Sequence, residues 1–300
     1  MSYHTSIMLE ECIEGLNIKE DGVYVDLTFG GGGHSKAILE KLNKGHLYAF
    51  DQDEDAQENA KDIDSRSFTL VQANFRYLKK YLKFYGVKKV DGILADLGVS
   101  SHQINEATRG FSTRFEGPLD MRMDQTLQKT AADVLNEYEE GELQRILGMY
   151  GEVRNAKTLA SEMVRRRVSK SFETINDLKE ILGKYAPRGR ENKYYAQVFQ
   201  AIRIEVNEEL KVLEEMLEQA NDVLNKDGRL VVMSFHSLED RIAKNYINKG
   251  NFHGEAEKDF YGNLLRPFQP VNRKPTIAKE EEIKSNNRAR SAKLRVAEKL

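Results

Sequence analysis

Four consecutive glycines, at positions 30–33, follow a strand-like segment and precede a helix-like one. Val23–Phe29 has the apolar, β-branched pattern of a buried strand, and residues 35–42 have the apolar spacing of a helix. Glycines in such a turn let backbone N–H groups approach a ligand closely, at a helix end that favours negative charge. A dinucleotide-binding turn prefers Gly or Ala where this chain has Ser35, so the turn alone does not identify the ligand.

Two carboxylates strengthen this candidate site. Asp51 ends the next predicted strand, 21 residues after Gly30, where a carboxylate accepts hydrogen bonds from both hydroxyls of a ribose. That position suits NAD as well as S-adenosylmethionine. Asp26 lies four residues before the glycines, where its carboxylate would face the cationic amino group of a methionine moiety. This second carboxylate favours S-adenosylmethionine, although Asp51 also fits the N-cap of the helix that follows it.

Polar residues follow two further predicted strands, where open α/β sheets place ligand-binding groups. Asp96 ends the strand Val90–Leu97, and the segment up to Gln103 adds amide and carbonyl acceptors. Such acceptors orient an exocyclic amine with its lone pair toward a methyl carbon, and no strong base is needed because the N–H becomes acidic as the bond forms. His236, after the strand Arg229–Phe235, is either a hydrogen-bonding or proton-accepting group or a half-buried structural histidine.

The elements that position these residues alternate between strand and helix over the first hundred residues, which predicts βαβ units and a parallel sheet. Phe75 follows the third strand and either stacks on an adenine or belongs to the core. Residues 99–125 form a long loop of the kind that is functional or disordered. We expect strands at 23–29, 46–50, 68–71, 90–97 and 229–235, helices at 131–137, 140–149, 155–168 and 174–185, one from Tyr194 and one over 204–224, and an extended loop at 267–275.

Composition excludes several classes of protein. The 300 residues, 40 % apolar and 31 % charged, predict a globular chain of about two domains. No run approaches the ~20 apolar residues of a membrane span, and the first residues lack a secretory signal. Cys12 is the only cysteine, and the six histidines contain no HxH or HxxxH pair, so we expect neither a disulfide nor a metal site, and a reducing cytoplasm.

Charge is unevenly distributed although the net charge is −2. Residues 150–203 carry twelve Lys/Arg against six Asp/Glu, and residues 284–299 carry six against one, whereas residues 51–64 carry seven acids against one lysine. The basic segments fit either contacts with nucleic-acid phosphates or solvated helix faces.

Several motifs together resemble the bacterial 16S ribosomal RNA small-subunit methyltransferase H (MraW) family of cytosine-N4 methyltransferases. The two longest are Gly117–Asp124 (GPLDMRMD) and Ser234–Arg241 (SFHSLEDR). The others are residues 26–35 (DLTFGGGGHS), 91–101 (DGILADLGVSS), 109–112 (RGFS), 199–210 (FQAIRIEVNEEL), 228–230 (GRL) and 287–295 (NRARSAKLR). They run in order over nearly the whole chain. The departures are His4-Thr-Ser-Ile-Met, Glu205 and Asn287, where the family has His-x-Pro-Val-Leu, an aromatic residue and Pro.

The resemblance implies an α/β fold of the class I S-adenosylmethionine-dependent methyltransferases, with a Rossmann-like sheet and an inserted all-helical domain. The methyltransferase domain would comprise residues 1–104 and 213–300, and residues 105–212 would form an RNA-recognition domain. The implied reaction is methylation of N4 of a cytidine in the decoding (P-site) region of 16S rRNA, within the small ribosomal subunit. The positions that match the family's cofactor contacts are Gly32, Gly33, His34, Asp51, Phe75, Asp96 and Gln103.

The loop at 99–125 gains a second interpretation from the resemblance. Its arginines and phenylalanines would hold a base extruded from RNA beside the methyl donor, or the arginines would pair with Asp120 and Asp124 and fold the loop. These residues are Arg109, Phe111, Arg114, Phe115 and Arg122.

Two other classes share part of this pattern. A nicotinamide-dependent oxidoreductase would share the glycine turn and Asp51, but it would continue its βαβ units where this chain becomes helical from residue 130. A catalytically silent RNA-binding assembly factor would bind RNA without the cofactor. The sequence leaves the oligomeric state open.

Overall fold

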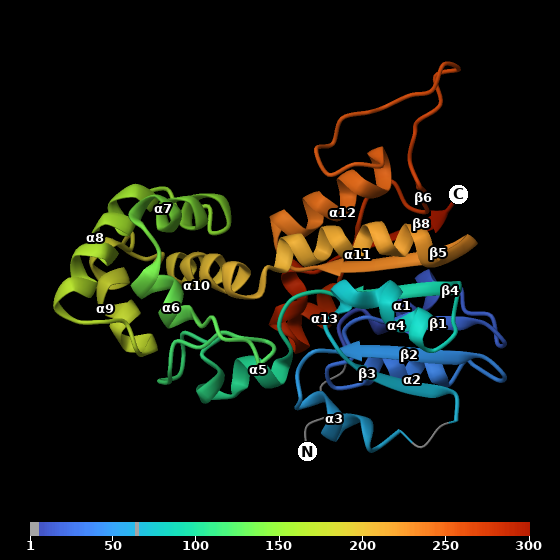
Figure 1. Ribbon diagram of the computed structural model, residues 1–300, viewed down its shortest axis with the longest axis horizontal. Helices are drawn as coiled ribbons and strands as arrows, with labels where there is room; N and C mark the ends of the chain where they lie inside the picture. The colour runs from blue at the N-terminus through green and yellow to red at the C-terminus, as the bar shows by residue number, and fades with distance from the viewer. Residues whose placement is uncertain (1–5, 64–65) are drawn as a thin grey trace. The chain divides into compact units, whose positions relative to one another are not determined.

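The computed structural model describes residues 6–63 and 66–300. The chain divides into two units, one formed by Met1–Gly98 and Leu210–Leu300 and the other by Val99–Glu209 (Figure 1). We refer to them as the sheet unit and the helical unit. The predicted joints fall further along the chain, by six residues at the first (104 against 98) and by three at the second (212 against 209).

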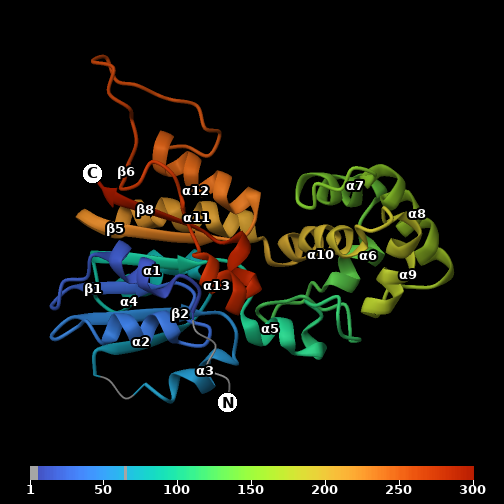
Figure 2. The ribbon, with the colours of Figure 1, turned by 180° about the vertical axis from the view of Figure 1, so that it is seen from behind.

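The sheet unit is built on one mixed sheet with the strand order β3-β2-β1-β4-β5-β8-β6, with β7 also paired to β8 (Figure 2). Strands β1 to β5 run parallel, and β8 is antiparallel to both β5 and β6. This confirms the α/β fold with a Rossmann-like sheet. The strands are β1 (Val23–Asp26), β2 (His46–Asp51), β3 (Phe68–Gln72), β4 (Val90–Asp96), β5 (Leu224–Ser234), β6 (Phe268–Pro270), β7 (Thr276–Ile277) and β8 (Lys293–Lys299).

Helices cover both faces of the sheet, which explains why its central strands are almost wholly apolar. On one face, Leu78 and Leu82 of α4 pack with α11 and α12 against residues such as Phe50 and Ile93. On the other face, α1, α2 and the segment around α13 pack against residues such as Leu94. The helices of this unit are α1 (Leu9–Leu16), α2 (Gly33–Leu39), α3 (Ala56–Ala60), α4 (Leu78–Phe84), α11 (Glu209–Val223), α12 (Ser237–Lys249) and α13 (Glu280–Ser285), with 3-10 turns η1 (Phe75–Tyr77) and η3 (Asn287–Ser291).

The helical unit has its own core, in which Phe172, Leu147 and Ile202 are fully buried. Two of its helices begin at capping boxes with a threonine N-cap, Thr130 with Asp133 and Thr174 with Asp177, which satisfy free N–H groups of the first turn. Its elements are α5 (Ser101–Asn105), η2 (Ala107–Arg109), α6 (Ala131–Glu137), α7 (Glu140–Met149), α8 (Ala156–Ser169), α9 (Ile175–Tyr185) and α10 (Glu191–Asn207). Within the described residues, no helix is long and apolar enough to cross a membrane.

The helix predicted over 204–224 is wrong in its first part. Helix α10 continues to Asn207, Glu208 adopts a left-handed φ of 50°, and α11 begins at Glu209. The Asn207 side chain explains the break, because it accepts a hydrogen bond from the N–H of Met123 (2.8 Å) and donates one to the carbonyl of Met121 (2.7 Å). These partners lie more than eighty residues away in sequence, beyond the reach of local periodicity.

The segment predicted as an extended loop contains β6, and the sheet gains β8 beyond it. Strand β5 also starts earlier than predicted, at Leu224, but its pairing with β4 shifts register between Val90 and Gly92, so that regular pairing begins at Arg229. The residues between form a bulge that includes Asp227 at φ 63°.

Candidate functional site

The candidate site lies at the carboxyl edge of the parallel strands. Asp26, Asp51 and Asp96 are the last residues of β1, β2 and β4. Backbone hydrogen bonds continue across the sheet just beyond them, from Leu27 N–H to the Leu94 carbonyl (2.8 Å) and from Phe29 N–H to the Phe50 carbonyl (2.9 Å). The glycine turn and these carboxylates therefore belong to one rigid edge.

The glycine turn is fixed by Asp51. Its Oδ2 accepts a hydrogen bond from the N–H of Gly30 (2.8 Å), and its Oδ1 accepts one from the N–H of Asp53 (2.9 Å). Gly30 and Gly32 have φ of 49° and 76°, in the left-handed region that favours glycine. A Cβ on Gly31 would meet no atom within 4 Å, whereas one on Gly33 would collide with the Ser6 side chain. The turn is thus open to a ligand at Gly31 and closed by protein at Gly33.

Asp26 and His34 are buried side chains at this edge. Asp26 is 1 % exposed and accepts hydrogen bonds from Ser35 Oγ (2.7 Å) and Thr28 N–H (3.1 Å). Burial raises the pKa of Asp26, which the nearby His34 and the Ser35 hydroxyl partly offset. Burial also lowers the pKa of His34, so its imidazole is neutral at neutral pH, with Nε2 3.2 Å from the carbonyl of Ile7.

The Asp96 carboxylate accepts fewer hydrogen bonds from the described protein than those of Asp26 and Asp51 do. Its N–H donates to Thr28 Oγ1 (2.7 Å), and its Oδ2 lies 3.8 Å from His34 Nδ1. The other oxygen, Oδ1, is buried and has no hydrogen-bond partner among the described residues. Burial, followed by the nearby carboxylates of Asp26 and Glu239, raises the pKa of Asp96 well above that of a free aspartate. Asp96 therefore offers an unused acceptor in a site of negative potential.

Asp51 is also perturbed. Burial raises its pKa to about 6, against the opposing effect of the N–H groups of Asp53 and Gly30. In the part of the chain that the structure covers, neither Asp51 nor Asp26 nor Asp96 forms an ion pair with Lys or Arg. Carboxylates kept in this state suit a cationic ligand and hydroxyl donors better than an anionic one.

Phe75 begins the turn η1 and is partly buried against the core of the sheet unit. The next residue, Arg76, forms a two-point ion pair with Glu215 of α11, with Nε–Oε2 and Nη2–Oε1 distances of 2.8 and 3.0 Å. Gln219 of α11 accepts from the N–H of Lys79 (2.9 Å) and donates to the carbonyl of Arg76 (2.7 Å). Helix α11 therefore fixes the turn that carries Phe75.

His236 is the N-cap of α12. Its Nδ1 accepts a hydrogen bond from the N–H of Glu239 (3.4 Å), and Glu239 Oε2 accepts from the N–H groups of Phe235 (2.9 Å) and His236 (3.3 Å). The imidazole Nε2 lies 3.2 Å from Glu239 Oε1. The structure therefore gives His236 a capping contact that occupies Nδ1.

Gln103 and the arginine-containing loop belong to the helical unit. Gln103 is 5 % exposed, and its Oε1 accepts from the N–H of Ser100 (3.0 Å) in a capping box. Arg109 is 2 % exposed and donates to the carbonyls of Arg122 and Met123 (both 3.1 Å), and Arg122 pairs with Asp120 (2.6 Å). Arg109 and Arg122 thus fold the loop, while Arg114 and Phe115 stay exposed.

The structure brings Gly32, Gly33, His34, Asp51 and Asp96 together at one edge, with Phe75 on the neighbouring turn η1. Sequence reasoning did not single out Thr28 or Glu239, which support Asp96 and His236. The only local signal for Glu239 was its position three residues after His236, which is the spacing of a capping box. That signal is weak because His is not among the usual N-cap residues. His4 lies outside the described residues.

The sheet, with its strand order, and the acidic edge beside the glycine turn are those of a class I S-adenosylmethionine-dependent methyltransferase. Residues 1–300 match the MraW methylase family, and the chain belongs to that family. S-adenosylmethionine is accordingly its cofactor, and the open space at Gly31 and the carboxylates of Asp26 and Asp51, which pair with no Lys or Arg of the described chain, fit that group.

Curated relatives match over the full length. "Ribosomal RNA small subunit methyltransferase H" of Cytophaga hutchinsonii is 59 % identical over 297 residues, which cover 99 % of both chains. The protein of the same name from Christiangramia forsetii is 55 % identical over 301 residues, covering 100 % of this chain and 99 % of that one. Among solved structures, an rRNA methylase from Streptococcus thermophilus matches with a TM-score of 0.41 at 14 % identity, covering 97 % of this chain and 93 % of that one. That likeness is too distant to add to the assignment.

Proposed function

We propose that this enzyme transfers a methyl group from S-adenosylmethionine to N4 of a cytidine in the decoding (P-site) region of 16S rRNA. Its partner would be the small ribosomal subunit, and its place the cytoplasm. The names of the full-length relatives support an rRNA of the small subunit as substrate. The observation that carries the choice of an exocyclic amine is the buried, unpartnered Oδ1 of Asp96 at the end of β4.

S-adenosylmethionine supplies a methyl carbon bound to a cationic sulfur. Asp96 Oδ1 accepts a hydrogen bond from the N4–H of cytidine and so turns the nitrogen lone pair toward that carbon. Transfer of that methyl group would leave a surplus proton on N4, which Asp96 Oδ1 would accept. A carboxylate whose pKa is raised by burial is suited to hold that proton.

The cofactor contacts follow from the same edge. The glycine turn, which is open at Gly31, would face the methionine moiety beside His34, and Gly32 and Gly33 are carried over as contacts from the family resemblance. Asp51 would accept from the ribose hydroxyls, since each of its oxygens accepts one backbone N–H and keeps a second lone pair. Phe75 would stack on the adenine. Gln103 is carried over from the family resemblance alone.

His236 is a second candidate for the proton acceptor. To accept a proton at Nδ1, it must give up the capping hydrogen bond from the N–H of Glu239. His236→Asn separates the two roles, because asparagine is a good N-cap residue but not a base. If His236 only caps α12, turnover is retained in His236→Asn. If His236 accepts the proton, turnover falls in His236→Asn while thermal unfolding is unchanged.

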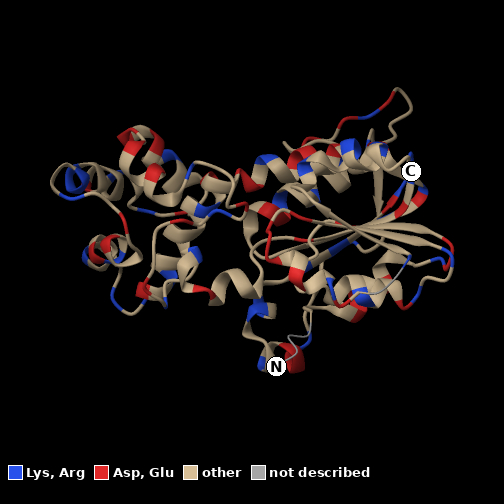
Figure 3. Cartoon of the chain, turned by 60° about the horizontal axis from the view of Figure 1, so that its bottom comes forward, with Lys and Arg blue, Asp and Glu red and all other residues tan. Residues whose placement is uncertain are grey.

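The helical insert, residues 105–212, is proposed as an RNA-recognition domain. Lys and Arg residues occur on helices of both units (Figure 3). In the insert, Arg188 and Arg190 are exposed between α9 and α10, and Lys193 is exposed in the first turn of α10. Exposed cations without a buried role are available for phosphate contacts.

Methyl transfer from labelled S-adenosylmethionine to small subunits from cells lacking this protein tests the proposal. The products are digested to nucleosides and compared for wild type and Asp96→Ala. We expect label as N4-methylcytidine, lost in the variant while cofactor binding remains measurable. Label in another nucleoside, or no label although cofactor binds, would refute the proposed substrate.

A further inference from the structure

Helix α4 and its flanking turns carry an unusual concentration of positive charge. Residues 73–90 contain six Lys or Arg and no Asp or Glu. Five aromatic residues lie among them: Phe75, Tyr77, Tyr81, Phe84 and Tyr85. The side of the helix that faces the protein carries Leu78 and Leu82, which are buried in the core of the sheet unit.

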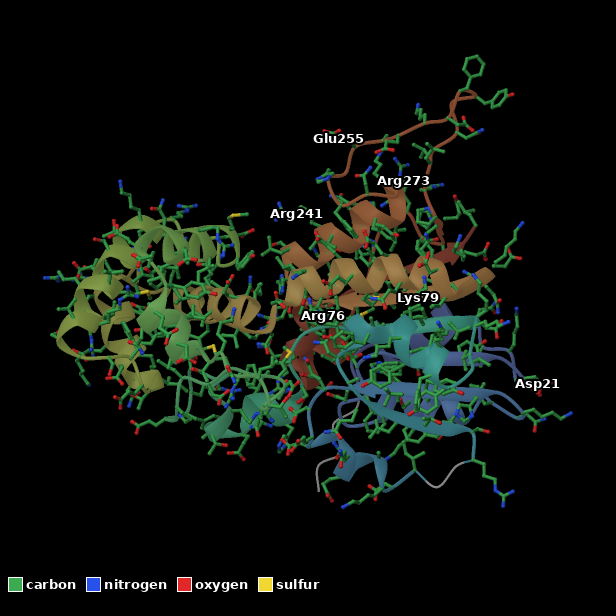
Figure 4. The ribbon with its side chains drawn as sticks, in the orientation of Figure 1. Asp21, Arg76, Lys79, Arg241, Glu255 and Arg273 are labelled. Carbon is green, nitrogen blue, oxygen red and sulfur yellow. The ribbon has the colours of Figure 1, made fainter. Side chains whose placement is uncertain are left out.

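Three of the six cations have partners in the protein. Arg76 pairs with Glu215, and Lys79 pairs with Asp222 (2.7 Å), both on α11; Figure 4 labels the two cations. Lys89 donates to the carbonyls of Asp222 (2.9 Å) and Leu224 (3.1 Å). These contacts attach α4 and its flanking turns to α11 and to the start of β5.

The other three cations are Lys80, Lys83 and Lys88. All are exposed, and none has an acidic partner within residues 6–63 and 66–300. Lys80 Nζ lies 5.6 Å from the ring centroid of Tyr77 and 6.0 Å from that of Tyr81. The rings thus hold an ammonium group that remains accessible to a partner.

The exposed aromatic rings of this surface point to the same kind of partner. Phe84 is 78 % exposed, Tyr77 48 % and Tyr85 39 %. The Phe84 ring meets Tyr85 edge to face at 5.1 Å, and Tyr85 lies 5.4 Å from Tyr48 of β2. A large aromatic ring that contacts its neighbours but remains exposed to water is typical of a surface that binds a partner.

We propose that this α4 surface (Tyr77, Lys80, Lys83, Phe84, Tyr85 and Lys88) binds single-stranded RNA outside the helical insert. The lysines contact phosphates, and an unpaired base stacks on Phe84. Proteins that bind single strands combine cations along the backbone with aromatic platforms for bases, which is the combination found here. An acidic protein would match the charge but would not require the rings. The inference rests on the proposed rRNA substrate and adds a contact on the sheet unit.

The test uses the full-length enzyme and 16S rRNA, both free of proteins and within small subunits. One variant combines Lys80→Ala, Lys83→Ala and Lys88→Ala. Its matched control combines Lys41→Ala, Lys44→Ala and Lys226→Ala, three exposed lysines elsewhere on the sheet unit that form no ion pair within the described ranges. Unchanged thermal unfolding and S-adenosylmethionine affinity show that each variant is folded and keeps its cofactor site.

We expect the α4 variant, unlike the control, to bind both RNA samples more weakly. Each lost phosphate contact makes the negative slope of log K (the association constant) against log salt concentration shallower by about 0.7, so the loss of three makes it shallower by about 2. The affinity ratio of wild type to variant then shrinks roughly 16-fold between 50 and 200 mM salt. Phe84→Leu should lose about 5- to 150-fold in affinity without changing the salt slope, and Phe84→Tyr should retain binding, because stacking needs an aromatic face.

Three results would overturn the inference. Binding by the α4 variant that equals the control excludes a phosphate contact at this surface. Loss of binding on small subunits alone, with protein-free rRNA bound normally, assigns the surface to an acidic protein of the subunit. If the wild type neither binds nor methylates rRNA, the proposed function is refuted and this inference with it. If the wild type methylates rRNA but the α4 variant binds it as well as the control does, only the inference about the α4 surface is refuted.

Discussion

Replacement of Asp96 by asparagine is expected to stabilise the cofactor-free protein while it removes activity. Asp96 Oδ1 is buried without a hydrogen bond, and burial raises the pKa of this carboxyl. Asp96→Asn keeps the shape and removes the uncompensated charge. We estimate a gain of about 1–3 kcal/mol in the free energy of unfolding, because an unpaired buried charge costs more than the unpaired buried amide that replaces it. For a domain of this size that is a rise of roughly 2–12 °C in Tm.

The gain should depend on pH in a defined direction. Below about pH 4, the carboxyl is protonated in both the folded and the unfolded states, and the variant gains little. As pH rises, the unfolded state loses its proton first, because its pKa is the lower one, so the wild type becomes less stable until the raised folded-state pKa is passed. The difference in Tm between variant and wild type therefore grows with pH.

Thermal unfolding of the cofactor-free protein from pH 4 to 8 measures this difference, and methyl transfer measures activity. Turnover should fall about 10²- to 10⁴-fold, the usual contribution of a positioned group that takes a proton. Asp91→Asn is the matched control on the same strand, because Asp91 Oδ2 accepts from the N–H of Val23 (2.9 Å) and Oδ1 from Asn225 (3.0 Å). That control should lose stability and keep turnover. A lower Tm for Asp96→Asn, or a gain that does not vary with pH, would refute the reasoning.

Three other predictions concern the cofactor site and the break between α10 and α11. S-adenosylmethionine affinity of the wild type, measured by calorimetric titration at pH 5 and pH 7.5, should be weaker at pH 5, because Asp51, with a pKa of about 6, then loses part of its acceptor capacity. Asp51→Ala should reduce this pH dependence, and an unchanged dependence would exclude Asp51 as a cause. Arg76→Ala should weaken cofactor binding several-fold in the same assay by freeing the turn of Phe75 from Glu215, and unchanged affinity would exclude this positioning role. Glu208→Gly should raise the stability of the helical unit by about 1 kcal/mol in denaturant unfolding, because Glu208 has a φ of 50°; a loss would show that the Glu208 side chain is needed.

Much of the sheet could be predicted because its central strands are buried on both faces. Strands β1 to β4 have short apolar runs that end at an acid or a polar residue, and their predicted starts agree with the structure. The starts of α6 and α9 were equally accessible, since Thr130 and Thr174 form capping boxes with an acid three residues on. In these places, local sequence determines local structure.

The elements that could not be predicted depend on residues far away in sequence. Four of the seven residues of β8 are charged, so the segment lacks the apolar pattern by which a strand is predicted. Its charges are satisfied by other elements: Arg295 pairs with Asp240 of α12 (2.7 Å), and Glu298 with Arg229 of β5 (2.9 Å). The same applies to Arg109 of the helical unit, whose burial depends on carbonyl groups more than a dozen residues further along the chain.

The charges of the site also decide between the two ligands that the glycine turn left open. Asp26 and Asp96 are close enough for the first to raise the pKa of the second, and no Lys or Arg of the described chain neutralises either. A pyrophosphate bound beside them would add negative charge to a buried acidic pair, whereas a sulfonium and an ammonium group would relieve their repulsion. The cost of keeping these carboxylates unpaired in the free protein is thus offset when the cation binds. The sequence predicts where the acids lie, but only the structure shows that no Lys or Arg of the described chain pairs with them, which favours a cationic ligand over a pyrophosphate at this edge.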